Sequence, residues 1–325
     1  SFTVTLQQVD SGGEGTPETP ETTTNRYYVL SKPVSGTNNA MVMEMETEEN
    51  YASSIFYYAG DKLLSYDKGL YVKEYDNTRG LQAVGEEPGT VKITTVGKTS
   101  TIAAPSYMHA SVNGTTYFVD HCGSDNGDPE HNFVLERMTA LPVTIGNALH
   151  ATLYAPVALE IPVGVKAYVL NEKNITAGSY VTMSRLSSII PANTGVILKS
   201  EKAGRFDFVI TESTYEAEKE ADGNVLEGTV AKSIVNEDAY ILANRNGNIG
   251  LYPLNTNSYI TGEATSTFTN NSHKAYLPVK GNFAQWLKES NGFRFVFDDD
   301  IVTDLHEVET DEDIETIYDL QGRKL

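Results

Sequence analysis

The chain has 325 residues, of which 40 % are hydrophobic, and 44 Asp and Glu against 24 Lys and Arg give it a formal net charge of −20. This length is enough for two domains that each bury a core, and the apolar content excludes a wholly disordered chain. The negative charge argues against nucleic acid as a partner, because phosphates would be repelled over most of the surface. No run of about 18 apolar residues is present, so we expect no membrane insertion.

The number of cysteines limits which covalent cross-links and metal sites this chain can form. Cys122 is the only cysteine, so neither an intrachain disulfide framework nor a cysteine-built zinc site can form.

Two short segments precede the main body. Residues 1–10 alternate apolar and polar positions like a strand, and residues 11–25 are a Gly, Pro, Thr and Glu run typical of a linker. We expect 1–10 to be the last strand of an upstream domain of the same polypeptide.

Residues 26–140 consist of short strand-like runs separated by Gly, Asn and Asp turns, a pattern typical of an all-β domain. Three apolar triplets, starting at Ile55, Val91 and Phe133, recur at intervals of roughly 40 residues. A threefold recurrence of that size predicts a β-trefoil-like domain, whose units close around a shared axis.

Residues 141–300 carry a recurrence of their own, in which Ala-Tyr is followed by aliphatic residues at 166–170, 238–242 and 274–278. Further strand-like runs with Gly punctuation surround these segments. We predict a second all-β domain, a β-sandwich-like one. Only "STYEAEKEADG" and "FAQWLKES" read as short helical turns.

The last part of the chain, 301–325, begins as an acidic connector and closes with "IYDLQGRKL". This ending resembles the start of the C-terminal sorting or attachment element of surface-exported proteins of the Bacteroidetes phylum. In that element a Tyr-Asp-Leu-Gln-Gly-Arg strand and turn is followed by a second strand and a basic end. The segments 136–170 and 190–199 also resemble the all-β module that often precedes the element.

The resemblance implies secretion or display on the outer cell surface. It also implies that this stretch is a non-catalytic C-terminal part of a modular protein. Because the second half of the element is missing here, we expect the natural protein to continue beyond Leu325.

The most suggestive cluster for chemistry is the loop "FVDHCGSDNGDPEHN", with Asp120, His121, Cys122 and His131. A nucleophilic site needs a base and an orienting carboxylate beside the nucleophile. His121 and Cys122 are neighbours in a strand and point to opposite faces, so we expect a polar loop and not an enzyme.

The same loop is a candidate metal site. Asp125, Asp128 and Glu130, with Asn126 nearby, supply oxygen donors in a Gly-rich turn, which suits calcium as the one candidate cofactor. The spacing does not match a complete EF-hand loop. A zinc site built from His109, His121 and His131 is a weaker alternative, because their spacing is not diagnostic.

Binding is the better-supported class of function. Sugar-binding trefoils stack an aromatic ring on the sugar and accept hydroxyl hydrogen bonds with Asp or Asn, so the candidate ligand-binding residues are Tyr117, Asp120, His121 and Asn126. The other tyrosines of this region serve either to stack on a sugar or as ordinary strand residues of the scaffold: Tyr57, Tyr58, Tyr66, Tyr71 and Tyr75. The Gln-any-Trp signature of ricin-type lectins is absent from the sequence.

The expected function is therefore glycan binding or adhesion at the cell surface, without catalysis in this chain. The first alternative is the accessory tail of a secreted hydrolase or peptidase whose catalytic domain lies upstream. The second alternative is a structural spacer.

Overall fold

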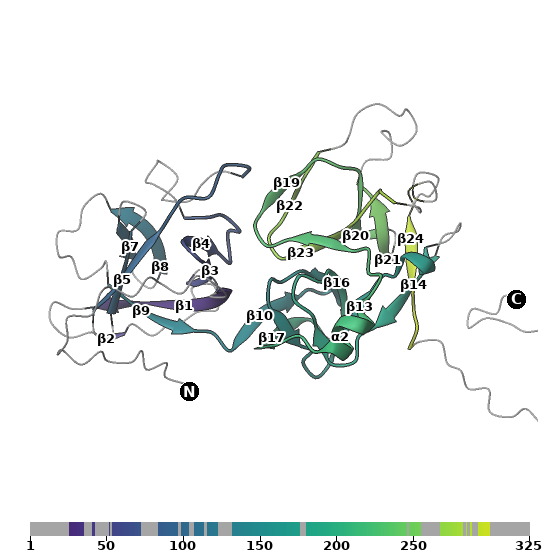
Figure 1. Ribbon diagram of the computed structural model, residues 1–325, viewed down its shortest axis with the longest axis horizontal. Coiled ribbons are helices and arrows are strands. Elements are labelled where there is room, and N and C mark those ends of the chain that lie inside the picture. The colour runs from purple at the N-terminus through teal and green to yellow at the C-terminus, as the bar shows by residue number, and fades with distance from the viewer. Residues whose placement is uncertain are drawn as a thin grey trace, which may run out of the picture.

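The computed structural model describes residues 26–35, 41–42, 52, 54–72, 84–96, 99–103, 107–113, 116–122, 132–175, 180–245, 247–254, 267–281, 284, 287 and 292–299. The described chain consists mainly of strands, which confirms the all-β prediction (Figure 1). Among the described helices none is long and apolar enough to cross a membrane.

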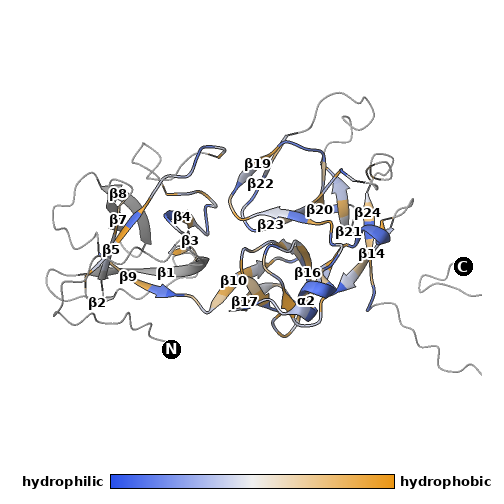
Figure 2. Ribbon diagram, viewed as in Figure 1, coloured by the Kyte–Doolittle hydropathy of each residue, from blue (hydrophilic) through white to orange (hydrophobic). Residues whose placement is uncertain are grey.

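The longest described helical element is α2 (Tyr215–Glu220), which lies inside the predicted "STYEAEKEADG" turn; a 3-10 turn, η2 (Glu172–Asn174), occurs earlier. The hydroxyl of Thr214 caps α2 by accepting a hydrogen bond from the Ala217 N–H at 3.2 Å. Only Ala217 of α2 is buried, so the helix presents a polar surface (Figure 2). The helix therefore lies at the surface and contributes little to the hydrophobic core.

The first nine strands form one antiparallel sheet, the N-terminal sheet, in the order β4-β3-β1-β9-β6-β7-β8, with β2 paired to β1 and β5 to β6. Strands adjacent in sequence pair as hairpins in β3-β4, β5-β6 and β7-β8. The strands are β1 (Arg26–Ser35), β2 (Met41–Val42), β3 (Ile55–Ala59), β4 (Lys62–Ser65), β5 (Lys92–Val96), β6 (Thr99–Ala103), β7 (Tyr107–Asn113), β8 (Thr116–Cys122) and β9 (Phe133–Arg137).

The three recurring triplets meet in one small core. Phe56, Val91 and Phe133, one from each triplet, are all buried in the same cluster, together with Leu63 and Ile102. The recurrence therefore marks positions that share a core. The trefoil itself stays a prediction.

The remaining strands, the C-terminal strands, form a sheet in the order β10-β17-β12-β15, a larger one in the order β11-β16-β13-β14-β24-β21-β20-β23-β18, and a β19-β22 pair. They are β10 (Ala140–Ile145), β11 (His150–Leu153), β12 (Ala158–Glu160), β13 (Val165–Val169), β14 (Tyr180–Arg185), β15 (Ile189–Ile190), β16 (Val196–Ser200), β17 (Gly204–Thr211), β18 (Glu227–Thr229), β19 (Ser233–Val235), β20 (Ala239–Arg245), β21 (Asn248–Pro253), β22 (Phe268–Asn270), β23 (Lys274–Pro278) and β24 (Phe293–Phe297).

The described strands form several sheets and a near-barrel, to which the larger of these sheets contributes. Its strand β23 returns close to its strand β11, where the Tyr154 N–H donates a hydrogen bond to the His273 carbonyl at 3.1 Å. The pairing of β14 with β24 is parallel, whereas the other described pairings of this sheet are antiparallel. The sandwich-like fold of this region stays a prediction.

The recurring Ala-Tyr pairs lie in β13, β20 and β23, and both residues of each pair are buried. Neighbouring residues of a strand face opposite sides, so these strands are covered on both faces. Each tyrosine hydroxyl has an acceptor: Asp299 Oδ1 for Tyr168 at 2.8 Å, the Leu287 carbonyl for Tyr240, and Glu237 Oε1 for Tyr276 at 3.0 Å. The motif thus buries an aromatic ring while its hydroxyl group keeps a hydrogen-bond partner.

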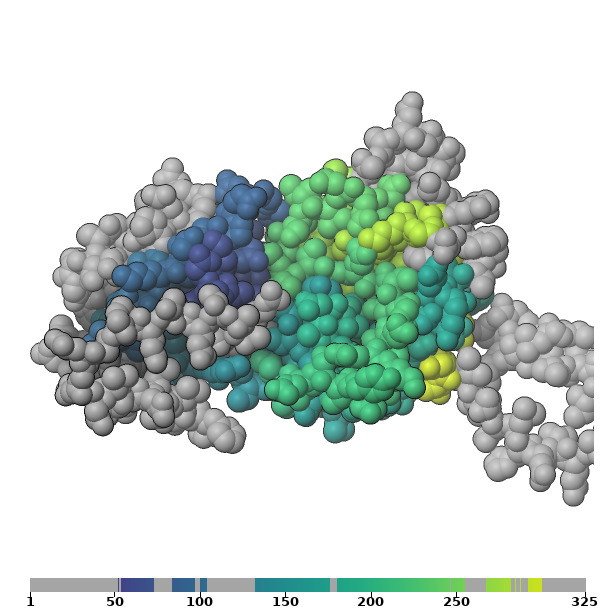
Figure 3. Space-filling model, in the orientation of Figure 1, coloured from purple at the N-terminus to yellow at the C-terminus, as the bar shows by residue number. Residues whose placement is uncertain are grey.

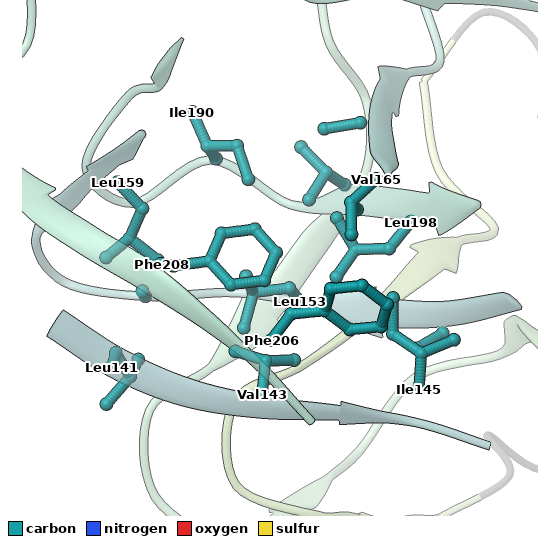
Figure 4. Packing of buried hydrophobic residues seen from close by; sticks show 14 of the residues in the cluster. Leu141, Val143, Ile145, Leu153, Leu159, Val165, Ile190, Leu198, Phe206 and Phe208 are labelled. Carbon is teal, nitrogen blue, oxygen red and sulfur yellow. The ribbon is translucent and has the colours of Figure 1, made fainter. Parts of the chain in front are cut away.

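Apolar side chains of β10, β11, β16 and β17 converge in the largest core (Figure 4). Phe206 and Phe208 of β17 lie at its centre, among Leu141, Val143 and Leu153. Alternate residues of β17 are exposed, which is the period of a strand with one solvated face.

The N-terminal sheet packs directly on the C-terminal strands (Figure 3). Ile55, Tyr57 and Leu64 belong to the same buried cluster as Phe206 and Phe208. Because the largest core contains residues from both sides, the two parts are joined by apolar packing; the domain boundary at 140/141 stays a prediction.

A backbone contact reinforces this junction. The Lys232 N–H donates a hydrogen bond to the Gly69 carbonyl at 2.7 Å. Gly69 has a φ of +66°, and a Cβ atom there would lie 2.6 Å from the Cβ of Ser272. Only glycine allows both this left-handed conformation and this close approach.

Candidate functional site

A cavity of about 370 Å³ lies at the junction between the N-terminal sheet and the C-terminal strands, and we name it the junction pocket. This volume is within the range of small-ligand sites, which occur preferentially where two structural units meet. The lining residues are Ala52, Tyr66, Asp67, Pro142, Val143, Thr144, Thr152, Leu153, Arg205, Ser272, His273 and Lys274.

Several separate parts of the chain build the walls, among them β11 with Thr152 and β17 with Arg205. Tyr66 and Asp67 follow β4 in the N-terminal sheet, while Pro142 and Thr144 belong to β10. The turn 271–273 between β22 and β23 closes the opposite side, and the Gly69 contact with Ser272 brings that turn against the segment after β4. The pocket therefore exists only because the two parts dock.

Tyr66 links the two sides of the pocket. Its hydroxyl donates a hydrogen bond to the Pro142 carbonyl, and its ring packs edge-on against the ring of His273, with centroids 5.0 Å apart. Burial raises the pKa of the Tyr66 hydroxyl well above its ordinary value, against a smaller opposite influence of the Arg205 charge. Tyr66 is therefore a neutral, fixed aromatic wall with a cation nearby.

His273 is held in place by its backbone. It has a φ of +57°, its N–H donates to the Thr229 carbonyl at 2.8 Å, and its carbonyl accepts from Tyr154. Burial, and to a smaller extent the Lys274 charge, lowers the pKa of the imidazole to about 3. At neutral pH the pocket thus contains an uncharged histidine.

Two cations line the pocket, Arg205 and Lys274. The Nε of Arg205 donates to Asp207 Oδ1 at 3.1 Å, which orients the guanidinium group. Burial lowers the pKa of the Lys274 ammonium. The one acid in the lining, Asp67, lies 2.7 Å from the Nζ of Lys68. The arrangement combines hydroxyl groups, an aromatic edge and two positive charges, and it suits binding of a polar ligand.

The residues predicted from the sequence lie elsewhere. Tyr117, Asp120 and His121 are on β8, where the register places them opposite Val112, His109 and Met108 of β7. This places their backbone in the N-terminal sheet; their role stays a prediction.

The predicted calcium ligands Asp125, Asp128 and Glu130, as well as Asn126, lie outside the described residues, and so does His131 of the zinc alternative. In the part of the chain that the structure describes, no group of three or more His, Cys, Asp or Glu side chains is arranged to hold a metal ion.

Sequence reasoning named Tyr66 among several tyrosines but missed Arg205, His273 and Lys274. The only local signal was a polar "SHK" placed directly before an Ala-Tyr strand. The positions that meet in the pocket are far apart along the chain, so no spacing rule connects them.

Comparison with known proteins gives no match for this chain among protein-family models, curated proteins or solved structures.

Proposed function

We propose that this chain is a non-catalytic, glycan-binding region of a secreted cell-surface protein, with the junction pocket as its binding site. The observation that carries the proposal is the pocket itself, whose lining combines three hydroxyl-bearing residues, Thr144, Thr152 and Ser272, with Tyr66. A sugar offers many hydroxyl groups and one apolar face, so such a lining matches it. Secretion and surface display rest on the resemblance of the closing "IYDLQGRKL".

The proposal includes the finer fold assignments. A trefoil-like N-terminal region is supported by the shared burial of Phe56, Val91 and Phe133, and a sandwich-like C-terminal region by strands buried on both faces. Calcium at Asp125, Asp128 and Glu130, and a second contact surface at Tyr117, Asp120, His121 and Asn126, are kept as parts of the proposal.

A glycan-array screen of the full chain, repeated with calcium and with a chelator, tests this function. Thr144 is exposed at the pocket, so Thr144→Trp should fill it without disturbing the core. Thr94→Trp is the matched control, because Thr94 is an exposed β5 residue outside the pocket lining.

We expect a defined hit that Thr144→Trp abolishes and Thr94→Trp retains. A hit that survives Thr144→Trp contradicts the pocket as the site and directs attention to β8. A blank array contradicts glycan binding and favours the accessory tail of a secreted hydrolase or peptidase, or a spacer. A hit lost only with the chelator supports the calcium proposal.

A further inference from the structure

We infer that the junction pocket selects an anionic saccharide, with Lys274 and Arg205 providing the counter-charges for its carboxylate or sulfate group. This inference rests on the proposed function and adds the charge class of the ligand. It is drawn from how the charged groups of the chain are paired, not from the shape of the pocket.

Among the lysines that the structure describes, Lys274 is one that burial withdraws from water although it forms no ion pair. Four of them lie beside a carboxylate: Lys62 beside Asp61, Lys68 beside Asp67, Lys166 beside Asp299, and Lys280 beside Glu227. Within the described residues the Lys274 ammonium makes no ion pair, although the whole chain contains 44 acidic residues. The acid that lines the same pocket, Asp67, is paired with Lys68 and not with Lys274.

The position of Lys274 makes that separation costly. Its ammonium group is largely withdrawn from water at the wall of the pocket, and desolvation lowers its pKa. A buried ammonium without a counter-ion is unfavourable, and an anionic ligand relieves that cost. The binding free energy of such a ligand therefore includes a contribution that a neutral sugar cannot obtain.

Arg205 adds a second positive charge on the β10-β17 side. Asp207 orients its guanidinium group at 3.1 Å, and its charge acts on the hydroxyl of Tyr66, which faces the same pocket. The buried imidazole of His273 stays neutral, so it adds no third positive charge to those of Lys274 and Arg205. The lining carries two cations and one acid: Arg205 is paired with Asp207, Asp67 is paired with Lys68, and Lys274 is the cation of the lining without an ion pair among the described residues.

The probes are digalacturonate, its dimethyl ester, which has the same sugar ring without the charge, and galactose 6-sulfate. Binding to the full chain is measured by isothermal titration calorimetry. We expect the acid to bind about ten-fold more tightly than the ester, a preference that shrinks as salt screens the charges. The sulfate arm separates recognition of any anion from recognition of a carboxylate.

The variants are Lys274→Gln, which removes the charge, and Lys274→Arg, which keeps it. Lys274→Gln should abolish the preference for the acid over the ester, and Lys274→Arg should retain most of it. Lys280→Gln is the matched control, because Lys280 is exposed and lies outside the pocket lining. Circular dichroism of each variant verifies that it is folded, and the salt dependence of the native chain tests the inference even if a variant fails to fold.

Equal binding of acid and ester by the native chain overturns the inference and leaves the proposed function standing, because a saccharide still binds. An acid preference that Lys274→Gln does not change also overturns it. If none of the three probes binds, the inference is wrong. The proposed function is then tested separately by the glycan array, which contains neutral sugars.

Discussion

Replacing His273 with Asn should make the stability of this protein less sensitive to acid. His273 is 5 % exposed and packs against Tyr66 at the junction pocket. Asn tolerates the positive φ of 57° at this position and cannot take up a proton in this pH range. The substitution therefore removes the titration while keeping the backbone conformation.

The sign follows from the two pKa values. The imidazole has an ordinary pKa of 6.5, and burial lowers it to about 3 in the folded protein. Between these values the unfolded chain binds a proton that the folded chain does not, so lowering the pH favours unfolding. The contribution of neutral His273 is present above pH 6.5 and is lost progressively as the pH falls towards 3.

The magnitude comes from the same two values. At pH 5 the unfolded imidazole is almost fully protonated, which lowers the free energy of unfolding by about 2 kcal/mol relative to pH 7. The many carboxylates titrate in both proteins and cancel in the comparison. Loss of the ring also costs packing energy in the variant, but that cost is the same at both pH values.

Urea unfolding followed by circular dichroism at pH 7 and pH 5 measures the effect in both proteins. We expect the free energy of unfolding of the native chain to fall by about 2 kcal/mol more than that of His273→Asn over this interval. An equal fall in both proteins would refute the reasoning, because it would mean that the folded protein protonates His273 as readily as the unfolded chain.

Two further predictions concern the contacts that hold the fold together. Gly69→Ala should lower the free energy of unfolding by about 1–3 kcal/mol, because alanine would have to adopt a positive φ and its Cβ would lie 2.6 Å from the Cβ of Ser272. Chemical denaturation measures this effect. An unchanged denaturation midpoint would contradict the close approach of Gly69 to Ser272. Asp299→Asn should lower the free energy of thermal unfolding at neutral pH by about 1–2 kcal/mol, because Asp299 Oδ2 lies 2.6 Å from the Nζ of Lys166 and Asp299 Oδ1 accepts a hydrogen bond from Tyr168. The control is Asp61→Asn at an exposed ion pair, which should change stability by less than about 0.5 kcal/mol. Equal effects of the two substitutions would contradict a stabilising role for the Asp299 contacts.

The effect of Asp299→Asn should also depend on pH. Burial raises the pKa of Asp299, but hydrogen bonds from Lys166 and Tyr168 and the charges of Lys166 and Arg185 outweigh it and hold the pKa below its ordinary value of 3.8. The stabilisation that ionised Asp299 contributes is therefore fully present above the ordinary pKa of 3.8, and it is lost as the pH falls through the lower pKa of the folded state.

The sequence by itself determined the class of the fold. Short apolar runs of period two, separated by turn residues, allow strands and little else, because a strand buries alternate residues and a helix does not. The same reasoning located α2 from the polar "STYEAEKEADG" segment and marked β13, β20 and β23 through their Ala-Tyr pairs. These are local properties, and local patterns report them.

Only the tertiary structure decided which strands pair and where a ligand can enter. The parallel pairing of β14 with β24 joins segments more than a hundred residues apart, and no turn between them specifies the register. The junction pocket depends on the docking of Tyr66 against Pro142 and His273, which the buried Ile55, Tyr57 and Leu64 drive by non-directional apolar packing. Because such packing depends on shape and not on sequence spacing, the site could be recognised only after the chain had folded.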